Sequence, residues 1–235
     1  VTFLSLFGVV MIASVTIPLT DGSLSMTLNH IVKLILAIFI GLLIFRVSLS
    51  TWKKIDISLI IFSFFLLTLV FFPLIGFEAN GASRWIRILG FSFQPSELMK
   101  FSLIIYISSY CFRRMTEFKE KWLGFWKPVL VVISAIALVL VEPDLGSSAV
   151  IFLISLSIMF IAGAPLKQML IIFFMGLSVF VSMILLVPWR MNRILSFVDP
   201  WSNYGESGYQ LSQALIAFSR GDLFGVGLGE SLQKY

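Results

Sequence analysis

One stretch, Gly81–Lys100 (GASRWIRILGFSFQPSELMK), places charged side chains in a sequence that is otherwise largely apolar. Charges this close to lipid are costly, so their presence needs a functional or structural reason. Gln94 and Pro95 mark a predicted helix start, because proline is favoured at the first helical position. Glu97 falls in the first turn and can pair with Lys100 at i, i+3.

Two arginines, Arg84 and Arg87, lie just before this helix start. With Lys100 they would surround a helix N-terminus, which is a favourable place for an anion such as a pyrophosphate. The alternative is that the arginines contact lipid phosphates and that Glu97 and Lys100 only neutralise each other. The local pattern leaves both interpretations open.

A second candidate is Glu142-Pro143-Asp144, two carboxylates separated by proline between apolar segments. At membrane depth such a pair could form a proton relay, a cation site or a wall of a catalytic cavity. Asp144 could also simply cap the next helix, because Leu145-Gly146-Ser147 follows it. The two roles are compatible, and the cost of burial favours a functional environment.

A third candidate is Arg190 with Arg193, three residues apart where the last apolar segment ends, which could meet a lipid-borne phosphate. Asp199 precedes Pro200, where a turn role is favoured. The glycines of the segment 225–229 lack a βαβ context, so we interpret them as tight turns and not as a phosphate loop.

The elements that must position these residues are membrane helices. Of the 235 residues, 59% are hydrophobic and 12% are charged, whereas soluble domains are about 25% charged. The net charge of +5 therefore concerns membrane orientation and not nucleic-acid binding. A single cysteine, Cys111, excludes an internal disulfide, and a lone His30 supports no metal site.

Apolar runs predict seven spanning helices, and basic residues between them set the orientation. The expected spans are 2–19, 29–46, 57–76, 95–112, 128–141, 145–163 and 169–188. Basic residues follow the second, fourth and sixth spans: Arg46, Lys53, Lys54, Arg113, Arg114, Lys119, Lys121, Lys127 and Lys167. The positive-inside rule puts these residues and the start of the chain in the cytoplasm. The 77–94 loop, the 142–144 turn and the 189–235 tail are then outside.

The fifth expected span is short. About 14 residues at 1.5 Å each cover roughly 21 Å, whereas the hydrocarbon core is about 30 Å thick. We therefore expect Glu142-Pro143-Asp144 to lie below the outer surface. In the tail, Gln210–Ser219 has an apolar face and is expected to be an amphipathic helix at the membrane surface.

The chain is expected to form one integral membrane domain over residues 1–235, truncated at both ends. It begins with Val1 inside an apolar run that lacks the features of a signal peptide. It stops at Tyr235 in a polar region, and residues 189–235 are expected to start a large outer loop.

Three blocks together resemble a known family. GASRWIRILGFSFQPSELMK, EPDLGSSAVIF and NRILSFVDPW with the following GYQLSQALIAFSRGDLFGVGLGESLQK agree in order and spacing with the SEDS family (shape, elongation, division and sporulation proteins). The resemblance covers essentially the whole chain. The tail is more similar to the cell-division branch of the family than to its elongation branch.

The resemblance implies an all-α polytopic fold of ten spans, of which this fragment would hold about seven. It also implies a peptidoglycan glycosyltransferase that polymerises lipid II in septal cell-wall synthesis. In the family, the outer loop continues into a segment with an essential Asp. That catalytic base would lie beyond Tyr235, so its position in this sequence is unknown, and neither Asp199 nor Asp222 is expected to replace it.

The residues present suit this chemistry, in which a sugar hydroxyl attacks an anomeric carbon and a polyprenyl pyrophosphate leaves. The substrate and cavity candidates are Arg84, Trp85, Gln94, Glu97, Lys100, Glu142, Asp144, Arg190 and Arg193. The cations would hold phosphates, Glu97 and Asp144 would hold the cations, and Trp85 could anchor the loop against the membrane or a sugar. No cofactor is expected, although a divalent cation could assist.

The expected partners are lipid II, membrane lipids, a class B penicillin-binding transpeptidase and other division proteins, with no nucleic acid. The expected location is the bacterial cytoplasmic membrane at the division septum. Two alternatives are a lipid II flippase and a non-catalytic scaffold of the division complex. A flippase needs polar residues along its whole path, and the expected cytoplasmic halves of the spans are nearly bare of charge.

Overall fold

The computed structural model of the chain describes residues 2–19, 23–72, 76–79, 82–88, 91–202, 204–205 and 207–234. Two compact units are present, Ser48–Met183 and the combination of Val1–Val47 with Ile184–Tyr235. Both units consist mainly of α-helices. The predicted all-α fold class is therefore confirmed. Among the described residues, three helices are long and apolar enough to cross a membrane: Ser25–Arg46, Trp122–Val141 and Leu166–Leu185.

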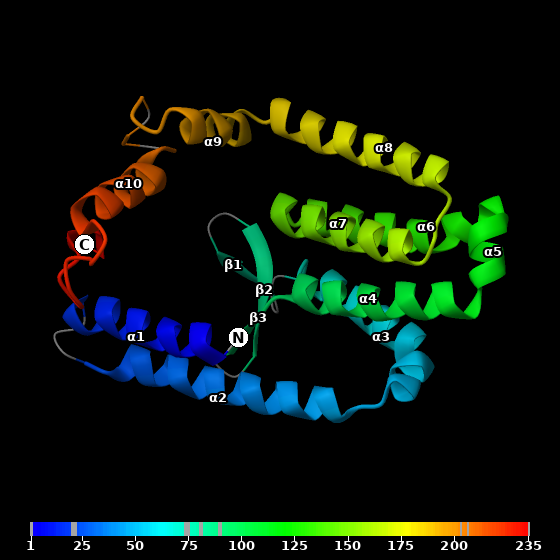
Figure 1. Ribbon diagram of the computed structural model, residues 1–235, viewed down its shortest axis with the longest axis horizontal. Helices are drawn as coiled ribbons and strands as arrows, with labels where there is room; N and C mark the ends of the chain where they lie inside the picture. Colours follow the sequence, from blue (N-terminus) through cyan, green and yellow to red (C-terminus); the bar gives the residue numbers. More distant parts are fainter. Residues whose placement is uncertain are drawn as a thin grey trace. The chain divides into compact units, whose positions relative to one another are not determined.

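The Ser48–Met183 unit is a helical bundle with a small sheet. Figure 1 shows α4, α6, α7 and α8 running side by side along it. Its helices are α3 (Leu49–Leu69), α4 (Pro95–Arg113), α5 (Met115–Glu120), α6 (Trp122–Val141), α7 (Leu145–Ile161) and α8 (Leu166–Leu185). The last residues of α8 lie beyond Met183, where the unit ends.

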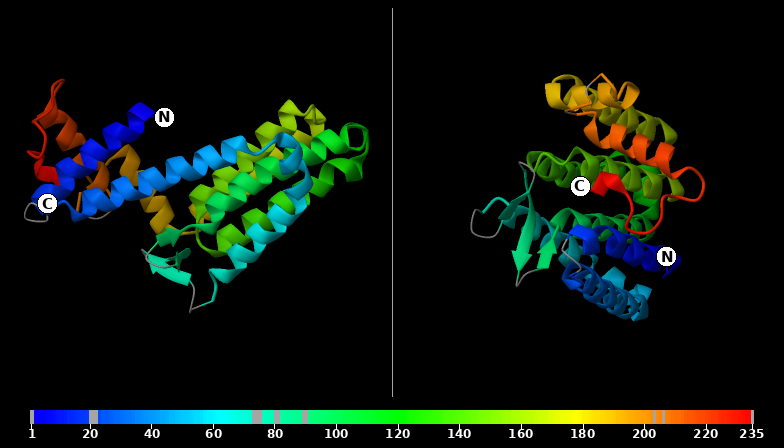
Figure 2. Two further views of the ribbon diagram at one scale, coloured as in Figure 1. Left: turned by 90° about the horizontal axis from the view of Figure 1, so that it is seen from below. Right: turned by 90° about the vertical axis from the view of Figure 1, so that its left-hand side faces the viewer.

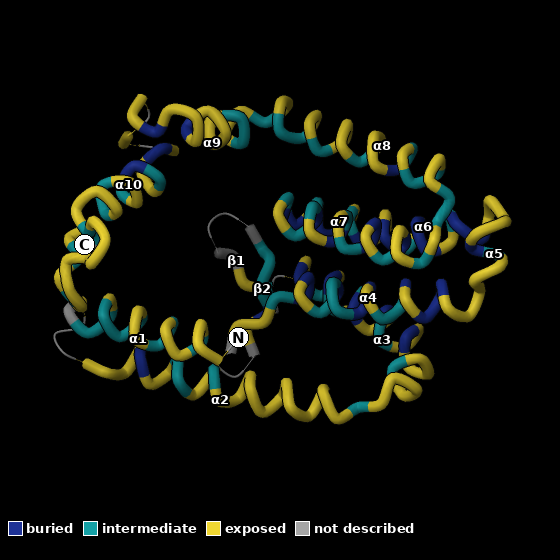
Figure 3. The backbone as a smooth tube through the Cα atoms, in the orientation of Figure 1, coloured by how far each residue is buried: buried dark blue, intermediate teal, exposed yellow. Residues whose placement is uncertain are grey.

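Helix α4 is the centre of the packing. It contacts α3, α6 and α7, and buried positions, dark blue in Figure 3, gather on these helices. Met99, Leu103 and Ile107 follow one another at i, i+4 spacing and are at most 1% exposed. Ser63 of α3 and Ser102 of α4 join their hydroxyls at 2.6 Å in this interior. Small hydroxyl residues of this kind let membrane helices approach closely and bond across the interface.

The third expected span, 57–76, was wrong at both ends. Helix α3 begins at Leu49, because the Ser48 hydroxyl accepts a hydrogen bond from the Thr51 backbone N–H and caps the helix. The charges at its start do not end the helix, because Asp56 is paired with Arg113 of α4 at 2.7 Å. At the other end the helix stops at Leu69, and a strand begins at Gly76.

The fifth expected span, 128–141, was too short. Helix α6 starts at Trp122 and contains Pro128 in its interior. Proline cannot donate to the carbonyl four residues earlier, which here belongs to Gly124. The Tyr110 hydroxyl donates to that carbonyl at 2.8 Å in its place. At 20 residues the helix is about 30 Å long, so its length does not place the 142–144 turn below the membrane surface.

A three-stranded antiparallel sheet occupies the loop between α3 and α4, where the sequence predicted no strands. It consists of β1 (Gly76–Ala79), β2 (Ala82–Ile88) and β3 (Phe91–Phe93) in that order. Phe77 pairs with Trp85, and Ile86 pairs with Phe93. The sheet lies at one end of the bundle, beside the start of α4 (Figure 2).

The other unit contains α1 (Thr2–Leu19), α2 (Ser25–Arg46), α9 (Pro188–Val198), α10 (Tyr209–Gly221) and the short 3-10 helix η1 (Leu232–Lys234). Hydroxyls of Thr16 and Thr27 join α1 to α2 at 3.1 Å. Helix α10 confirms the amphipathic helix expected at 210–219, whereas α9 was not foreseen. Gly225, Gly227 and Gly229 all have positive φ angles, which confirms the tight turns expected there.

Candidate functional site

Strand β2 directs Arg84 and Trp85 to opposite sides, because successive strand residues alternate between faces. Ile86, on the same face as Arg84, is buried at 1% exposure. On the other face, Arg87 lies over the Phe77 ring at 4.0 Å from its centroid. The alternation therefore separates the two arginines that the sequence grouped together around one anion.

Arg84 binds the turn between α6 and α7. Its Nε donates to the Glu142 carbonyl at 3.0 Å, and its Nη2 donates to the Pro143 carbonyl at 2.5 Å. These carbonyls follow the last turn of α6, where helix carbonyls lack intrahelical partners. A guanidinium carries five N–H donors, so donors remain after these two bonds are made.

Asp144 joins α7 to the start of α4. It caps α7 as predicted, accepting from the Ser147 backbone N–H at 2.9 Å and from the Ser147 hydroxyl at 2.8 Å. Gln94, which precedes Pro95 at the first position of α4, donates its Nε2 to Asp144 at 3.0 Å. Asp144 is only 8% exposed, so these bonds replace the water that its carboxylate loses.

Glu142 is the most buried acid of this cluster, with 1% exposure. Neither carboxyl oxygen has a hydrogen-bond partner among the described residues. The pKa of the carboxyl is raised to about 8, chiefly by burial and also by the charge on Asp144, while the Arg84 charge lowers it in part. The group therefore favours its neutral form near neutral pH.

Glu97 and Lys100 form the predicted pair on α4, with Lys100 Nζ at 2.7 Å from Glu97 Oε1. The Lys100 side chain is 17% exposed and that of Glu97 is 58% exposed. Glu97 thus holds a cation as predicted, whereas the bonds of Asp144 are to Gln94 and Ser147. Asp144 was expected to hold one of the cations, but it forms no ion pair among the described residues.

Four of the predicted residues thus come together as what we call the turn cluster: Arg84, Gln94, Glu142 and Asp144. Arg190 and Arg193 lie on α9, in the other unit. Sequence reasoning missed the Pro143 carbonyl as a ligand of Arg84. It had no local signal for that contact, since strand β2 itself was not predicted.

Sequence reasoning also missed a buried ion pair between α3 and α4. Arg113 Nη2 lies 2.7 Å from Asp56 Oδ2, and Arg113 also donates to the Ser109 hydroxyl at 2.8 Å. The Asp56 side chain is 2% exposed. The available signal was an acid directly before one expected span and an arginine directly after another. Both residues lie just outside the expected spans, so the prediction that the cytoplasmic halves of the spans are nearly bare of charge stays a prediction.

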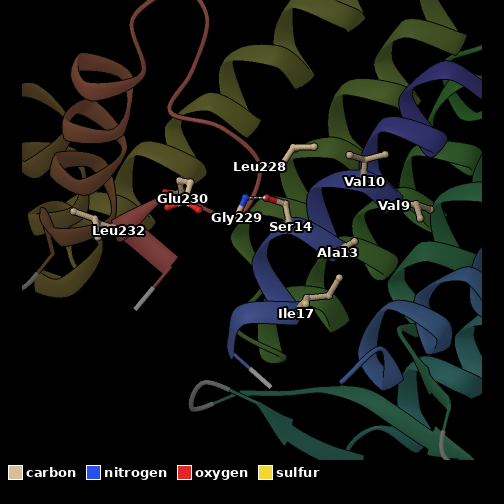
Figure 4. Close-up of a pocket in the computed structure, with 10 residues that line it drawn as sticks. Val9, Val10, Ala13, Ser14, Ile17, Leu228, Gly229, Glu230 and Leu232 are labelled. Atoms are coloured by element: carbon tan, nitrogen blue, oxygen red, sulfur yellow. Dashed lines mark hydrogen bonds between the residues drawn. The ribbon is translucent and has the colours of Figure 1, made fainter. Parts of the chain in front are cut away.

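A cavity of about 810 Å³ belongs to the Val1–Val47 and Ile184–Tyr235 unit, and its lining includes none of the turn cluster. Figure 4 shows it between one side of α1 and the segment 228–232. The Gly229 N–H donates to the Ser14 hydroxyl there at 2.7 Å. Among the described residues, no group of three or more His, Cys, Asp or Glu side chains could hold a metal ion.

Comparison with known proteins covers the whole chain. A family model described as "Cell cycle protein" and named for FtsW, RodA and SpoVE matches residues 1–235. A "probable peptidoglycan glycosyltransferase FtsW" of Aliivibrio salmonicida is 40% identical over 235 residues, covering 98% of this chain and 58% of the relative. The protein of the same name in Saccharophagus degradans is 46% identical over 194 residues, covering 83% of this chain and 50% of the relative.

Solved structures share the fold. A chain from a peptidoglycan synthase complex, described by the words "structural coordination of polymerization and crosslinking", has a TM-score of 0.66 at 25% identity. It matches 92% of this chain and 63% of its own length. The rod shape determining protein RodA of Thermus thermophilus has a TM-score of 0.61 at 21% identity, matching 99% of this chain and 77% of its own.

Proposed function

Because the chain belongs to the family of cell cycle proteins that includes FtsW, RodA and SpoVE, we propose that it carries part of a peptidoglycan glycosyltransferase. The proposed reaction polymerises lipid II into glycan strands during cell division. Relatives with that activity in their names support it, at 40% and 46% identity. The chain spans 58% and 50% of those relatives, so the activity of the whole protein is a proposal.

In this reaction a sugar hydroxyl attacks the anomeric carbon of a lipid-linked sugar. A carbon–oxygen bond forms there, the bond to the pyrophosphate breaks, and the hydroxyl proton goes to a base. Negative charge grows on the departing polyprenyl pyrophosphate, which positively charged donors would stabilise. The proposed donors are Lys100 and the donors of Arg84 not used by the turn. In the other unit, Arg190 and Arg193 are separately proposed to meet a lipid-borne phosphate.

The observation that carries the proposal is the turn cluster. It ties the 142–144 turn to the start of α4 through Arg84, Gln94 and Asp144. Bonds to fixed carbonyls and a capped helix hold these groups before substrate arrives, so less reorganisation is needed in the transition state. Lys100, in the second turn of α4, is then held on the same helix that the cluster fixes.

The test uses the full protein, purified with its transpeptidase partner and given labelled lipid II. An inhibitor of the unrelated class of glycan polymerases is present, and products are separated on a gel. Asp144→Asn and Lys100→Gln should each abolish long glycan strands while the protein remains folded. Glu120→Gln, an exposed acid at the end of α5, is the matched control and should leave synthesis unchanged.

Normal strand synthesis by Asp144→Asn or Lys100→Gln would refute the site assignment. Absence of strands from the unmodified protein, together with movement of lipid II across liposome membranes, would favour transport. Unimpaired synthesis in every variant would instead fit a scaffold.

The chain is a multi-pass membrane protein. Its proposed location is the cytoplasmic membrane at the division septum, with the start of the chain in the cytoplasm. The proposed partner is a class B penicillin-binding transpeptidase, and similarity to a chain of a peptidoglycan synthase complex supports it. Lipid II is the proposed substrate. A divalent cation is the one proposed addition to the reaction.

A further inference from the structure

An apolar groove of about 260 Å³ lies between α6, α7 and α8, within the Ser48–Met183 unit. Its walls include Ile133, Ala137 and Leu140 of α6 and Met175 and Val179 of α8. Every lining residue is apolar, with the indole N–H of one tryptophan as the polar exception. Water can form almost no hydrogen bonds with such a surface, so an apolar occupant is favoured.

The groove opens sideways from the bundle. Ile133 is 47% exposed, Met175 is 56% exposed and Val179 is 50% exposed. Both α6 and α8 are apolar enough to cross a membrane. The opening therefore faces the hydrocarbon of the bilayer, from which an acyl chain can enter without crossing water.

A glycine shapes the groove. A Cβ added at Gly176 of α8 would lie 2.3 Å from Cζ of Phe152, so the ring packs directly against the helix backbone and would have to move if the glycine were replaced. The Phe152 ring also packs against Phe180 at 5.9 Å between centroids. The ring thus forms a wall between α7 and α8 and keeps the space between α6 and α8 open.

At the start of α6 the groove ends on a polar group, and three lysines belong to the helix ends and turns on that side of the bundle. The indole N–H of Trp126, which lines the groove, is buried and has no hydrogen-bond partner in the described residues. Lys127 follows it on α6, and Lys167 is in the first turn of α8. The Lys119 ammonium lies at the turn between α7 and α8, since a Cβ built at Gly163 would be 3.0 Å from its Nζ.

None of these three lysines belongs to an ion pair found within the described part of the chain. We propose that the groove holds one acyl chain of an anionic phospholipid, with the lipid phosphate among Lys119, Lys127 and Lys167. Trp126 donates its N–H to a phosphate or ester oxygen of that lipid. Charge complementarity selects this occupant over a protein helix, which would leave the N–H unpaired and the lysines without counter-charge.

The test measures quenching of Trp126 by lipids with brominated chains. The full protein is reconstituted into phosphatidylcholine vesicles that contain increasing fractions of brominated phosphatidylglycerol, or of brominated phosphatidylcholine with the same chains. Emission of the Trp126→Phe variant is subtracted to isolate the signal of Trp126. Quenching by the anionic lipid should reach half saturation at a mole fraction at least about five-fold lower than quenching by the neutral lipid.

Two kinds of variant complete the design. Ala137→Phe places a ring in the groove and should remove the saturable quenching, whereas Leu130→Phe, at a 59% exposed position of α6 outside the groove, should retain it. Lys167→Gln changes an end charge without filling the groove and should weaken the preference for the anionic lipid by about five-fold.

Equal quenching by the anionic and neutral lipids would overturn the charge-based choice of occupant. Identical behaviour of Ala137→Phe and Leu130→Phe would overturn the groove as the binding site. Failure of either lipid to quench Trp126 would show that protein covers the groove, which also refutes the proposal. Glycan synthesis is not the readout, so these outcomes are independent of the proposed enzymatic function.

Discussion

Arg84 and Asp144 have different tasks in the turn cluster, although both are charged. Arg84 supplies donors to two backbone carbonyls, and Asp144 supplies acceptors to a helix N-terminus and to Gln94. Glu142 accepts from Arg84 through its backbone carbonyl, but its carboxyl oxygens have no hydrogen-bond partner among the described residues. A buried carboxyl without partners is stable only when neutral.

Replacing Glu142 with glutamine should therefore reduce the pH dependence of stability. Burial raises its pKa in the folded protein to about 8, from an ordinary value of 4.5. Below 4.5 the group is protonated in both states and its contribution is fully present. As pH rises toward 8 the unfolded chain ionises first, so the free energy of unfolding falls.

The measurement is the unfolding temperature in detergent between about pH 4 and about pH 9, a range that spans this window. The unmodified protein should lose stability more steeply across it than Glu142→Gln. Glu120→Gln, at an exposed position, should keep the slope of the unmodified protein. Coincident slopes for Glu142→Gln and the unmodified protein would contradict a neutral, buried Glu142.

Two substitutions at Asp144 should separate its capping role from its chemical role. Asparagine is as good an N-cap as aspartate, whereas alanine costs about 0.5–2 kcal/mol of stability. We expect Asp144→Asn to unfold at nearly the original temperature and Asp144→Ala to unfold earlier, with glycan synthesis lost in both. Equal synthesis in Asp144→Asn and the unmodified protein would leave only the capping role.

At the scale of elements, the passage from α4 through α5 to α6 depends on close backbone approach. A Cβ at Gly124 would lie 2.0 Å from the Glu117 carbonyl oxygen, and Tyr110 donates to the Gly124 carbonyl. The glycine and the tyrosine together permit Pro128 inside α6. This contact fixes the start of a spanning helix against the core helix α4.

Gly124→Ala should therefore destabilise the protein, by roughly 1–3 kcal/mol as for other overpacked sites. Gly41→Ala is the matched control, because a Cβ at this position of α2 meets nothing within 4 Å. Alanine there should be neutral or stabilising by helix propensity. Thermal unfolding of the two variants in detergent is the measurement, and equal unfolding temperatures would contradict the close approach.

At the scale of the whole molecule, the basic segments predict which side of the membrane each connection faces. Cysteine labelling in intact cells tests this, in a Cys111→Ser background. A membrane-impermeant maleimide should label Ser92→Cys in β3 without permeabilisation. It should label Lys54→Cys in α3 only after permeabilisation, because both side chains are exposed and the predicted orientation puts them on opposite sides of the membrane.

Labelling of both cysteines in intact cells, or the reverse pattern, would contradict the orientation. Permeabilised cells provide the control for accessibility, since both positions should then react. Native Cys111 is buried at 5% exposure, so its removal guards against slow background labelling. The same orientation would bring the basic end of the groove between α6 and α8 to the cytoplasmic leaflet, where anionic lipids are enriched.

The sequence by itself determined the helices and several of their ends. An apolar run long enough to span a bilayer can be recognised within one stretch of sequence, and helix starts such as those at Asp144 and Pro95 depend only on near neighbours. The Glu97–Lys100 pair is equally local. Local rules could predict these features because every partner lies within one or two helical turns.

Only the tertiary structure decided which charges meet. Arg84 reaches carbonyls 58 and 59 residues away, and Arg113 reaches Asp56 on a different helix. The predicted start of α6 was wrong because Pro128 leaves the Gly124 carbonyl without its usual helical donor. The hydroxyl of Tyr110, on another helix, donates to that carbonyl instead. Long-range partners follow from how elements pack, and packing is set by the shapes and volumes of whole helix faces, which a local pattern does not encode.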